Sequence, residues 1–96
     1  MLGTFERAFS DRCALGFHYT DQNGRRTLRR AEPHGLLVEP PVWYVLARDI
    51  DKREPRMFRM DRISRARLLP EDRFRPDFSV IDVQVPDRER WHPLAG

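Results

Sequence analysis

Three arginines recur at every third residue near the middle of the chain: Arg56, Arg59 and Arg62. Each guanidinium presents a planar pair of N–H donors that matches two oxygens of a phosphate. Guanidiniums that lie close together repel one another unless an anion bridges them. One interpretation is therefore a binding site for a phosphate-bearing ligand. The other is a set of separate surface arginines, each paired with a nearby acid: Asp61, Glu71 or Asp72.

The positive charge of the chain is concentrated in one segment. Its eighteen basic residues are seventeen arginines and one lysine, and the formal net charge is +3. Residues 56–75 hold seven arginines against three acids, whereas residues 76–96 hold two against four. A GC-rich genome alone can produce such an arginine bias, but the local excess still predicts a surface that attracts anions.

Four ring-bearing side chains offer stacking surfaces for bases: Tyr19, His34, Trp43 and Tyr44. In proteins that bind single-stranded nucleic acid, each stacked base contributes about 1–3 kcal/mol. Trp43 and Tyr44 lie in a continuous apolar run, so a core position is the stronger prediction for them. Tyr19 and His34 adjoin turns and stay candidates for the site. A protonated His34 would donate to a phosphate at about pH 6.

Other chemistry has little support in the sequence. Cys13, His18, His34 and His92 lack the spacing of a zinc site. No glycine-rich phosphate loop, nucleophile elbow or catalytic carboxylate pair occurs. Asp61 lies among arginines, so we expect it to be ionised and paired. We therefore predict no metal, no cofactor and no enzymatic activity.

Periodicity predicts the elements that position these residues. Residues 2–12 have apolar side chains on one face of a short helix, and residues 13–20 alternate as a strand does. An Asn-Gly pair within residues 21–24 predicts a hairpin turn. Residues 25–32 then form the returning strand, which a proline ends, and residues 36–38 resume an extended run.

Two segments after residue 40 predict further elements of the fold. Residues 42–47 are apolar without alternation, which predicts a strand buried on both faces, as in a small closed barrel covered from outside. Residues 56–68 fit either a helix or, as we prefer, two strands around a short turn at 61–63. In a strand, Arg56 and Arg59 start on opposite faces, and a bulge or turn must re-aim one of them to join them.

The totals indicate one domain of mainly β structure. Ninety-six residues support a single modest core, and no apolar run reaches the length of a membrane span. The N-terminus lacks the apolar core of a secretory signal, and the one cysteine cannot form an internal disulfide, so we expect a cytoplasmic protein. We assign residues 1–75 to a barrel with an N-terminal helix and residues 76–96 to a proline-containing extended tail, in which Trp91 docks back as an anchor.

Four blocks of the sequence together resemble the WYL domain, which is named after a Trp-Tyr-Leu tripeptide. They are FHY at 17–19, RRAEPHGL at 29–36, VWYV at 42–45 and RMFRMDRI at 56–63. Val45 stands where the tripeptide has leucine. The resemblance extends over roughly residues 5–75 and rests on the order and spacing of all four blocks.

This resemblance implies an Sm/SH3-like five-stranded barrel in a bacterial transcription regulator. Such domains resemble sensors that bind nucleic-acid fragments in a basic pocket and act on a helix-turn-helix DNA-binding domain. No such DNA-reading motif occurs in these residues, so we expect it elsewhere in cis or on another chain. The resemblance also adds Arg29 to the pocket candidates Tyr19 and His34. The alternative for Arg29 is an ion pair with Glu32 or with a cross-strand acid.

Two functions follow from these observations. The first is a regulatory module that binds an anionic ligand, single-stranded nucleic acid or a nucleotide, through the residues Tyr19, Arg29, His34, Arg56, Arg59 and Arg62. The second is a protein-interaction or homodimerisation module, because Sm-like barrels have open strand edges that pair readily. In that case the arginines contact acids of a partner and the tail wraps a neighbouring subunit. Neither function involves a membrane.

Overall fold

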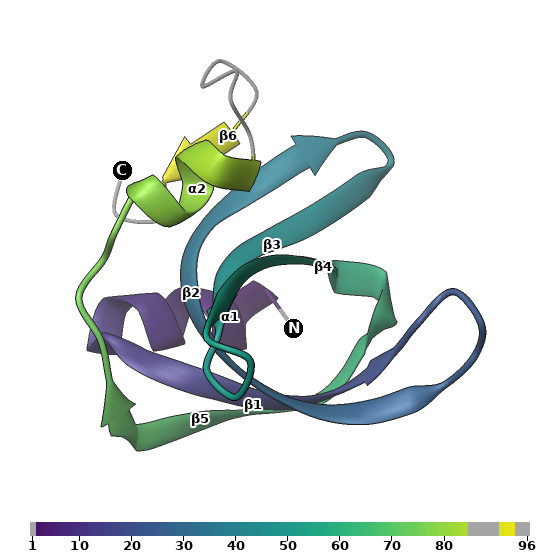
Figure 1. The fold of residues 1–96 in the computed structure, drawn as a ribbon, viewed down its shortest axis with the longest axis horizontal. Coiled ribbons are helices and arrows are strands. Elements are labelled where there is room, and N and C mark those ends of the chain that lie inside the picture. The colour runs from purple at the N-terminus through teal and green to yellow at the C-terminus, as the bar shows by residue number, and fades with distance from the viewer. Residues whose placement is uncertain (1, 85–90, 94–96) are drawn as a thin grey trace.

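The computed structural model describes residues 2–84 and 91–93, and its dominant feature is a strongly curved antiparallel sheet (Figure 1). Its elements are, in chain order, α1 (Leu2–Asp11), β1 (Cys13–Thr20), β2 (Arg26–Glu39), β3 (Val42–Asp49), β4 (Glu54–Arg59), the 3-10 turn η1 (Met60–Arg62), β5 (Ile63–Arg73), α2 (Ser79–Gln84) and β6 (Trp91–Pro93). The prediction of a mainly β fold with an N-terminal helix is confirmed.

The strands lie in the order β4-β3-β2-β1-β5, and β6 adds to β2. The β1–β2 hairpin has the predicted turn. There the Asp21 carboxylate accepts hydrogen bonds from the amides of Asn23 (2.8 Å) and Arg25 (2.9 Å). Gly24 has a φ of 81°, a conformation that a residue without Cβ adopts at little cost. The turn therefore forms where the Asn-Gly pair predicts it.

Contacts between β1 and β4 show that the sheet closes on itself. These strands are not neighbours in the sheet, yet the Tyr19 and Phe58 rings meet edge to face with centroids 5.0 Å apart. The Arg59 amide also donates to the Tyr19 hydroxyl at 3.1 Å. A flat sheet would hold β1 and β4 two strands apart, so the sheet must curl into a barrel.

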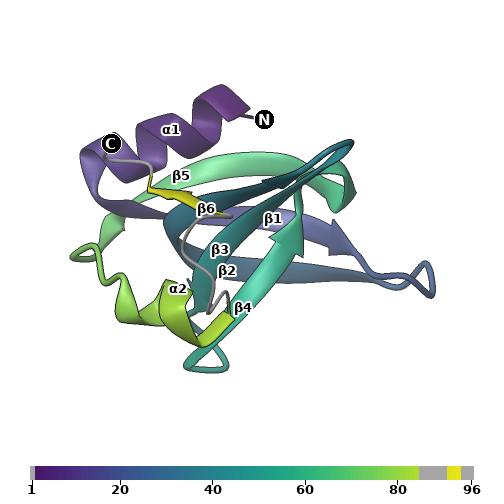
Figure 2. The ribbon, with the colours of Figure 1, turned by 90° about the horizontal axis from the view of Figure 1, so that it is seen from above.

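One apolar cluster fills this barrel and contains residues of α1 and of each of the strands β1 to β5. Its buried members are Phe5, Ala8, Leu15, Phe17, Tyr19, Ala31, Leu36, Val45, Ala47, Phe58 and Ile63. Figure 2 shows α1 lying along the barrel beside β5, and α2 on another side. The helix α1 thus covers apolar surface that the curved strands alone leave exposed, with Phe5 and Ala8 in the core.

β3 is buried on both faces in its middle, at residues 45–47, as its apolar run predicts, but not at its beginning. Val45 and Ala47 belong to the barrel core. Leu46 points the other way and packs with Leu37 of β2 and Ile81 of α2 in a second cluster. The short helix α2 is therefore the layer that covers this strand from outside.

Three details differ from the sequence prediction. β2 runs through the expected break at residues 33–35, because the register against β3 shifts between Pro33 and Gly35 and leaves His34 as the extra residue of a bulge. The preferred strand–turn–strand prediction for residues 56–68 is confirmed, but the turn, the 3-10 element η1, lies at 60–62, one residue earlier than expected. The tail is not simply extended, because it contains α2 and β6.

Part of the tail returns to the barrel. The backbone of Trp91 pairs with that of Leu37 in β2, as expected for an anchor, although its side chain lies outside the described part of the structure. Residues 85–90 and 94–96 also lie outside it. Among the described residues, no helix has the length and apolar character needed to cross a membrane.

Candidate ligand-binding site

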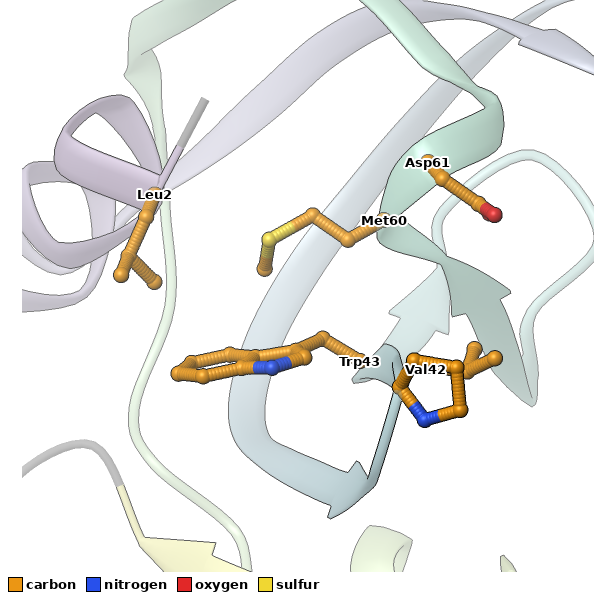
Figure 3. A pocket seen from close by; sticks show the side chains of 6 residues that line it. Leu2, Val42, Trp43, Met60 and Asp61 are labelled. Carbon is orange, nitrogen blue, oxygen red and sulfur yellow. The ribbon is translucent and has the colours of Figure 1, made fainter.

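A pocket of about 350 Å³ opens where three distant segments meet: the start of α1, the β2–β3 turn and η1. Its lining is mostly apolar and consists of Leu2, Pro41, Val42, Trp43, Met60 and Asp61. Figure 3 shows the Met60 side chain extending across the pocket beside the Trp43 ring, with Leu2 facing them from α1. The pocket therefore offers an aromatic face, a flexible thioether and one carboxylate.

Trp43 does not have the core position that its apolar run predicts, since it is 40% exposed. Along β3 it shares the inward face with Val45 and Ala47, because side chains two residues apart point the same way. It lies at the beginning of the strand, directly after the Pro40-Pro41 turn, and so beyond the packed core. Tyr44 is half-buried against the second apolar cluster. Only Trp43 of this pair lines the pocket.

Two of the predicted arginines, Arg59 and Arg62, act on the pocket residue Asp61, although neither lines the pocket itself. Arg59 Nε and Nη2 donate to the two carboxylate oxygens of Asp61 at 3.1 and 2.8 Å. These hydrogen bonds lower the pKa of the Asp61 carboxyl, and the charges of Arg59 and Arg62 add to the effect. Arg62 makes no ion pair with a residue that the structure describes. The group thus carries one positive charge in excess.

Tyr19 holds the backbone of Arg59 in place from the barrel core. Its ring is buried in the core between Phe17 and Phe58, and its hydroxyl accepts the hydrogen bond from the Arg59 amide. A base cannot stack on a ring that is enclosed in this way. In this structure Tyr19 fixes the end of β4, from which Arg59 projects.

Arg56 lies on the other face of β4 from Arg59. The register against β3 is unbroken from Asp49 opposite Glu54 to Tyr44 opposite Arg59, so no bulge re-aims either arginine. The Arg56 guanidinium carbon lies 5.8 Å from the centroid of the Phe58 ring, a cation–π contact at the edge of the core. The three arginines that recur at every third residue are therefore not gathered at one point.

Arg29 is held at the opposite end of β3, in an ion pair with a buried acid. Its Nη1 lies 3.2 Å from an oxygen of Asp49, and its Nε donates to the Thr27 hydroxyl at 3.1 Å. The Asp49 side chain is 1% exposed, and its other oxygen accepts from the Lys52 amide. This is the cross-strand ion pair named above as the alternative for Arg29. Arg29 also lines a separate pocket of about 380 Å³.

His34 lies in the interior, with 1% of its surface exposed. Its Nδ1 accepts a hydrogen bond from the Asp77 amide at 3.0 Å, so the proton of the neutral ring is on Nε2. Burial lowers the pKa of His34 to about 4. At neutral pH the ring is therefore uncharged and accepts a hydrogen bond at Nδ1, which opposes the expected role as a protonated phosphate donor.

The structure thus links Arg59 and Arg62 through Asp61, holds the Arg59 backbone at Tyr19, and places Arg29, Arg56 and His34 elsewhere. Sequence reasoning missed the pocket itself, including Trp43 and Met60 as lining residues. One signal was present: a Pro-Pro turn places the residues that follow at the start of a strand, where the core ends. Within the described residues, no group of three His, Cys, Asp or Glu side chains is arranged to hold a metal ion.

Comparison with known proteins adds to this geometry. The model of the WYL domain matches residues 1–68. Protein PafB of Mycobacterium leprae (strain TN) is 35% identical over 57 residues, which cover 58% of this chain and 17% of that protein. The solved structure of proteasome accessory factor B/C (PafBC) of Arthrobacter aurescens matches with a TM-score of 0.78 at 22% identity, over 90% of this chain and 14% of that one.

The structural likeness at that identity concerns the fold. The chain spans less than a fifth of each relative, 17% of PafB and 14% of PafBC, so their other parts have no counterpart in it. The family model, in contrast, covers more than half of the chain, including all the strands of the barrel except the end of β5. The chain belongs to the WYL domain family.

Proposed function

We propose that this domain is the ligand-sensing part of a bacterial transcription regulator and that it binds single-stranded nucleic acid or a nucleotide in the Trp43 pocket. The observation that carries the proposal is an exposed tryptophan in the same pocket as Asp61, the carboxylate that pairs with Arg59 and lies close to the charge of Arg62. A base stacks on the indole face, and the guanidiniums take the phosphate that follows it. Membership of the WYL family supports the regulatory role.

The apolar lining suits a base better than a bare anion. Met60 and Leu2 face the Trp43 ring, so a planar heterocycle in the pocket would contact apolar atoms on two sides. The pocket volume, about 350 Å³, is at the lower end of the range for small-ligand sites. One or two nucleotide units are the expected occupant.

Asp61 is the charged residue among the pocket lining, and its pairing decides which arginine charge is available to a ligand. With Arg59 bound to Asp61, the free positive charge belongs to Arg62. A phosphate that reaches Arg59 must displace a carboxylate, and an exposed ion pair of this kind contributes little to stability. Exchange of Asp61 for a ligand phosphate would free η1 to move, which offers a route from binding to a structural response.

The helix α1 offers a second route, because Leu2 is part of the pocket lining. An occupant that packs on Leu2 changes the contacts of the first turn of α1, the element closest to whatever precedes the domain in a longer chain. We propose that a DNA-binding domain in cis, or on another chain, receives the signal there.

Fluorescence anisotropy with short labelled single-stranded DNA, RNA and cyclic nucleotides tests the proposal. We expect Trp43→Ala and Arg62→Gln each to weaken binding about tenfold, since each removes a contact of about 1.5 kcal/mol. Arg26→Gln removes the same charge from an exposed residue that lines none of the described pockets and is the matched control. Unchanged binding of both pocket variants, or equal weakening in the control, would overturn the proposal.

The interaction module remains a second candidate because β4 is an edge strand of the sheet. Its Met57 side chain points outward and is 39% exposed. Sedimentation with and without oligonucleotide separates the two functions. A dimer that forms regardless of oligonucleotide and dissociates in Met57→Lys would favour the interaction module.

A further inference from the structure

A second basic site lies at the other end of α1. Arg12 directly follows this helix, and Arg73 and Arg75 lie at and beyond the end of β5. Together with Phe74 they line a pocket of about 460 Å³. None of the three arginines was a candidate from the sequence, because 60 residues lie between Arg12 and Arg73 along the chain.

The backbone holds these arginines in place. The Phe74 ring is 8% exposed and packs edge to face on Phe9 of α1, with centroids 6.4 Å apart. The Phe74 amide donates to the Arg12 carbonyl at 3.0 Å, and the first residue of β1, Cys13, pairs with Arg73. Residues on either side of an extended, buried residue project to its opposite face. Arg73 and Arg75 are therefore directed together, away from the core.

The charge of this site is not neutralised within the described residues. There, Arg12, Arg73 and Arg75 make no ion pair. Three acids close to them in sequence have other partners: Asp11 pairs with Arg7, Asp72 with Arg30, and the Asp77 carboxylate accepts from Ser79. A fourth, Glu71, forms no ion pair with these arginines in the described part of the chain. Three guanidiniums in one pocket repel one another, and an anion that bridges them relieves this repulsion.

We propose that Arg12, Arg73 and Arg75 bind a phosphate group that carries two or more negative charges. Arginine is suited to this task because its fork of donors matches two phosphate oxygens, and three forks saturate a terminal phosphate or a pyrophosphate. Free nucleotides and the phosphorylated end of a nucleic acid both supply such a group. The site is separate from the Trp43 pocket and does not depend on the function proposed for that pocket.

The conformation of Arg12 provides a variant that separates binding from folding. Its φ is 54°, in the left-handed region, at the position after a helix where glycine is the favoured residue. Arg12→Gly therefore removes the guanidinium and relieves the backbone at the same time. We expect this variant to melt at a higher temperature than the parent and yet to bind phosphate more weakly. Unfolding cannot explain such a loss.

Titration of the 96-residue chain with sodium pyrophosphate, followed through the Nε–Hε signals of its arginines by NMR, tests the site directly. We expect the signals of Arg12, Arg73 and Arg75 to shift together with one binding curve. Calorimetry should give about tenfold weaker binding for Arg12→Gly, Arg73→Gln and Arg75→Gln, and unchanged binding for the control Arg26→Gln. Absence of these shifts, or equal weakening in the control, would overturn the proposal.

Two further measurements identify the source of the phosphate and keep the two sites apart. If a short oligonucleotide with a 5′-phosphate binds more tightly than its 5′-hydroxyl form, the phosphate belongs to a nucleic-acid end. If the two forms bind equally and pyrophosphate still binds, the phosphate belongs to a free nucleotide. Trp43→Ala should leave the pyrophosphate shifts unchanged. If it abolishes them, there is no separate site.

Discussion

Two of the arginines expected to bind ligand form ion pairs, and the burial of their partner acids gives them different roles. Asp61 is exposed, with 60% of its side chain accessible, so water and salt screen its pair with Arg59. Asp49 is 1% exposed, so its charge depends on Arg29 for compensation. Arg59 is therefore free to exchange its partner for a phosphate, whereas Arg29 is tied to the structure.

Replacing Arg29 should accordingly affect stability first. We expect Arg29→Ala to lower the free energy of unfolding by about 3 kcal/mol, because it leaves a buried carboxylate without its partner. Urea denaturation followed by circular dichroism measures this. Asp49→Asn on top of Arg29→Ala should recover part of the loss. An Arg29→Ala variant that is as stable as the parent but binds oligonucleotide poorly would instead make Arg29 a ligand residue.

The buried His34 predicts a specific pH dependence of stability. Burial lowers its folded pKa from 6.5 to about 4, so between these values the unfolded chain takes up a proton that the folded chain refuses. The free energy of unfolding should therefore be at its highest with respect to His34 above about pH 6.5. It should fall by up to about 3 kcal/mol as the pH drops to about 4.

The glutamine variant isolates this contribution. His34→Gln keeps an acceptor for the Asp77 amide and has no titrating group, so urea midpoints of parent and variant should converge as the pH falls through this window. Carboxylates far from His34 titrate alike in both proteins and cancel in the difference, whereas Asp77 and Glu32, which interact with His34, contribute to it. Parallel curves for the two proteins would show that His34 is protonated as easily in the folded state as in the unfolded one.

At the scale of elements, the end of β4 depends on one hydrogen bond to β1. The Tyr19 hydroxyl accepts from the Arg59 amide, directly before η1 and its two pocket residues. Neither strand pairs with the other in the sheet, so this bond adds to ring packing in fixing the barrel seam next to the pocket.

Removing that hydroxyl should cost stability without disturbing the core. We expect Tyr19→Phe to lower the free energy of unfolding by about 1 kcal/mol, the usual net contribution of one such hydrogen bond. Tyr44→Phe is the control, since the Tyr44 hydroxyl makes no hydrogen bond with a described residue. Equal denaturation midpoints for the parent and both variants would show that the bond to Arg59 contributes nothing.

Local patterns predicted the elements that depend on local forces. The alternation at 13–20, the turn at 21–24 and the apolar run of β3 all correspond to what forms. The continuity of β2 was not predictable, because a proline such as Pro33 usually ends a strand. Here β2 continues past Pro33 because it pairs with β3 through a bulge.

The pocket was not predictable from the sequence for a related reason. It forms where residues near positions 2, 42 and 60 meet, and no periodicity within one segment encodes that meeting. The arginine pattern at every third residue predicted one cluster. A strand period of two places Arg56 and Arg59 on opposite faces instead.

At the scale of the whole molecule, the net charge of +3 attracts nucleic acid generally, and salt dependence tells this attraction from contacts in the pocket. Each phosphate neutralised on a single strand contributes about −0.7 to the slope of log affinity against log salt. We expect Arg62→Gln to reduce this slope by about 0.7. Trp43→Ala should weaken binding at every salt concentration with the slope unchanged, because stacking releases no counterions.

Anisotropy titrations of one short single-stranded DNA over a series of salt concentrations give these slopes. The control Arg26→Gln should retain the slope of the parent. A slope that falls equally in Arg62→Gln and in the control would mean that the strand binds through the diffuse positive field, with no defined phosphate contact at the pocket.

The position of α1 has a consequence for the size of ligand that the domain favours. Leu2 at its start belongs to the Trp43 pocket, and Arg12 directly after its end belongs to the arginine site. The helical rise from position 2 to position 12 is about 15 Å. A mononucleotide is too short to occupy both, whereas a chain of several nucleotides gains avidity from the second contact. The length of α1 would then set the preferred ligand length. Affinity should rise sharply at the shortest oligonucleotide that reaches from the Trp43 pocket to the arginine site.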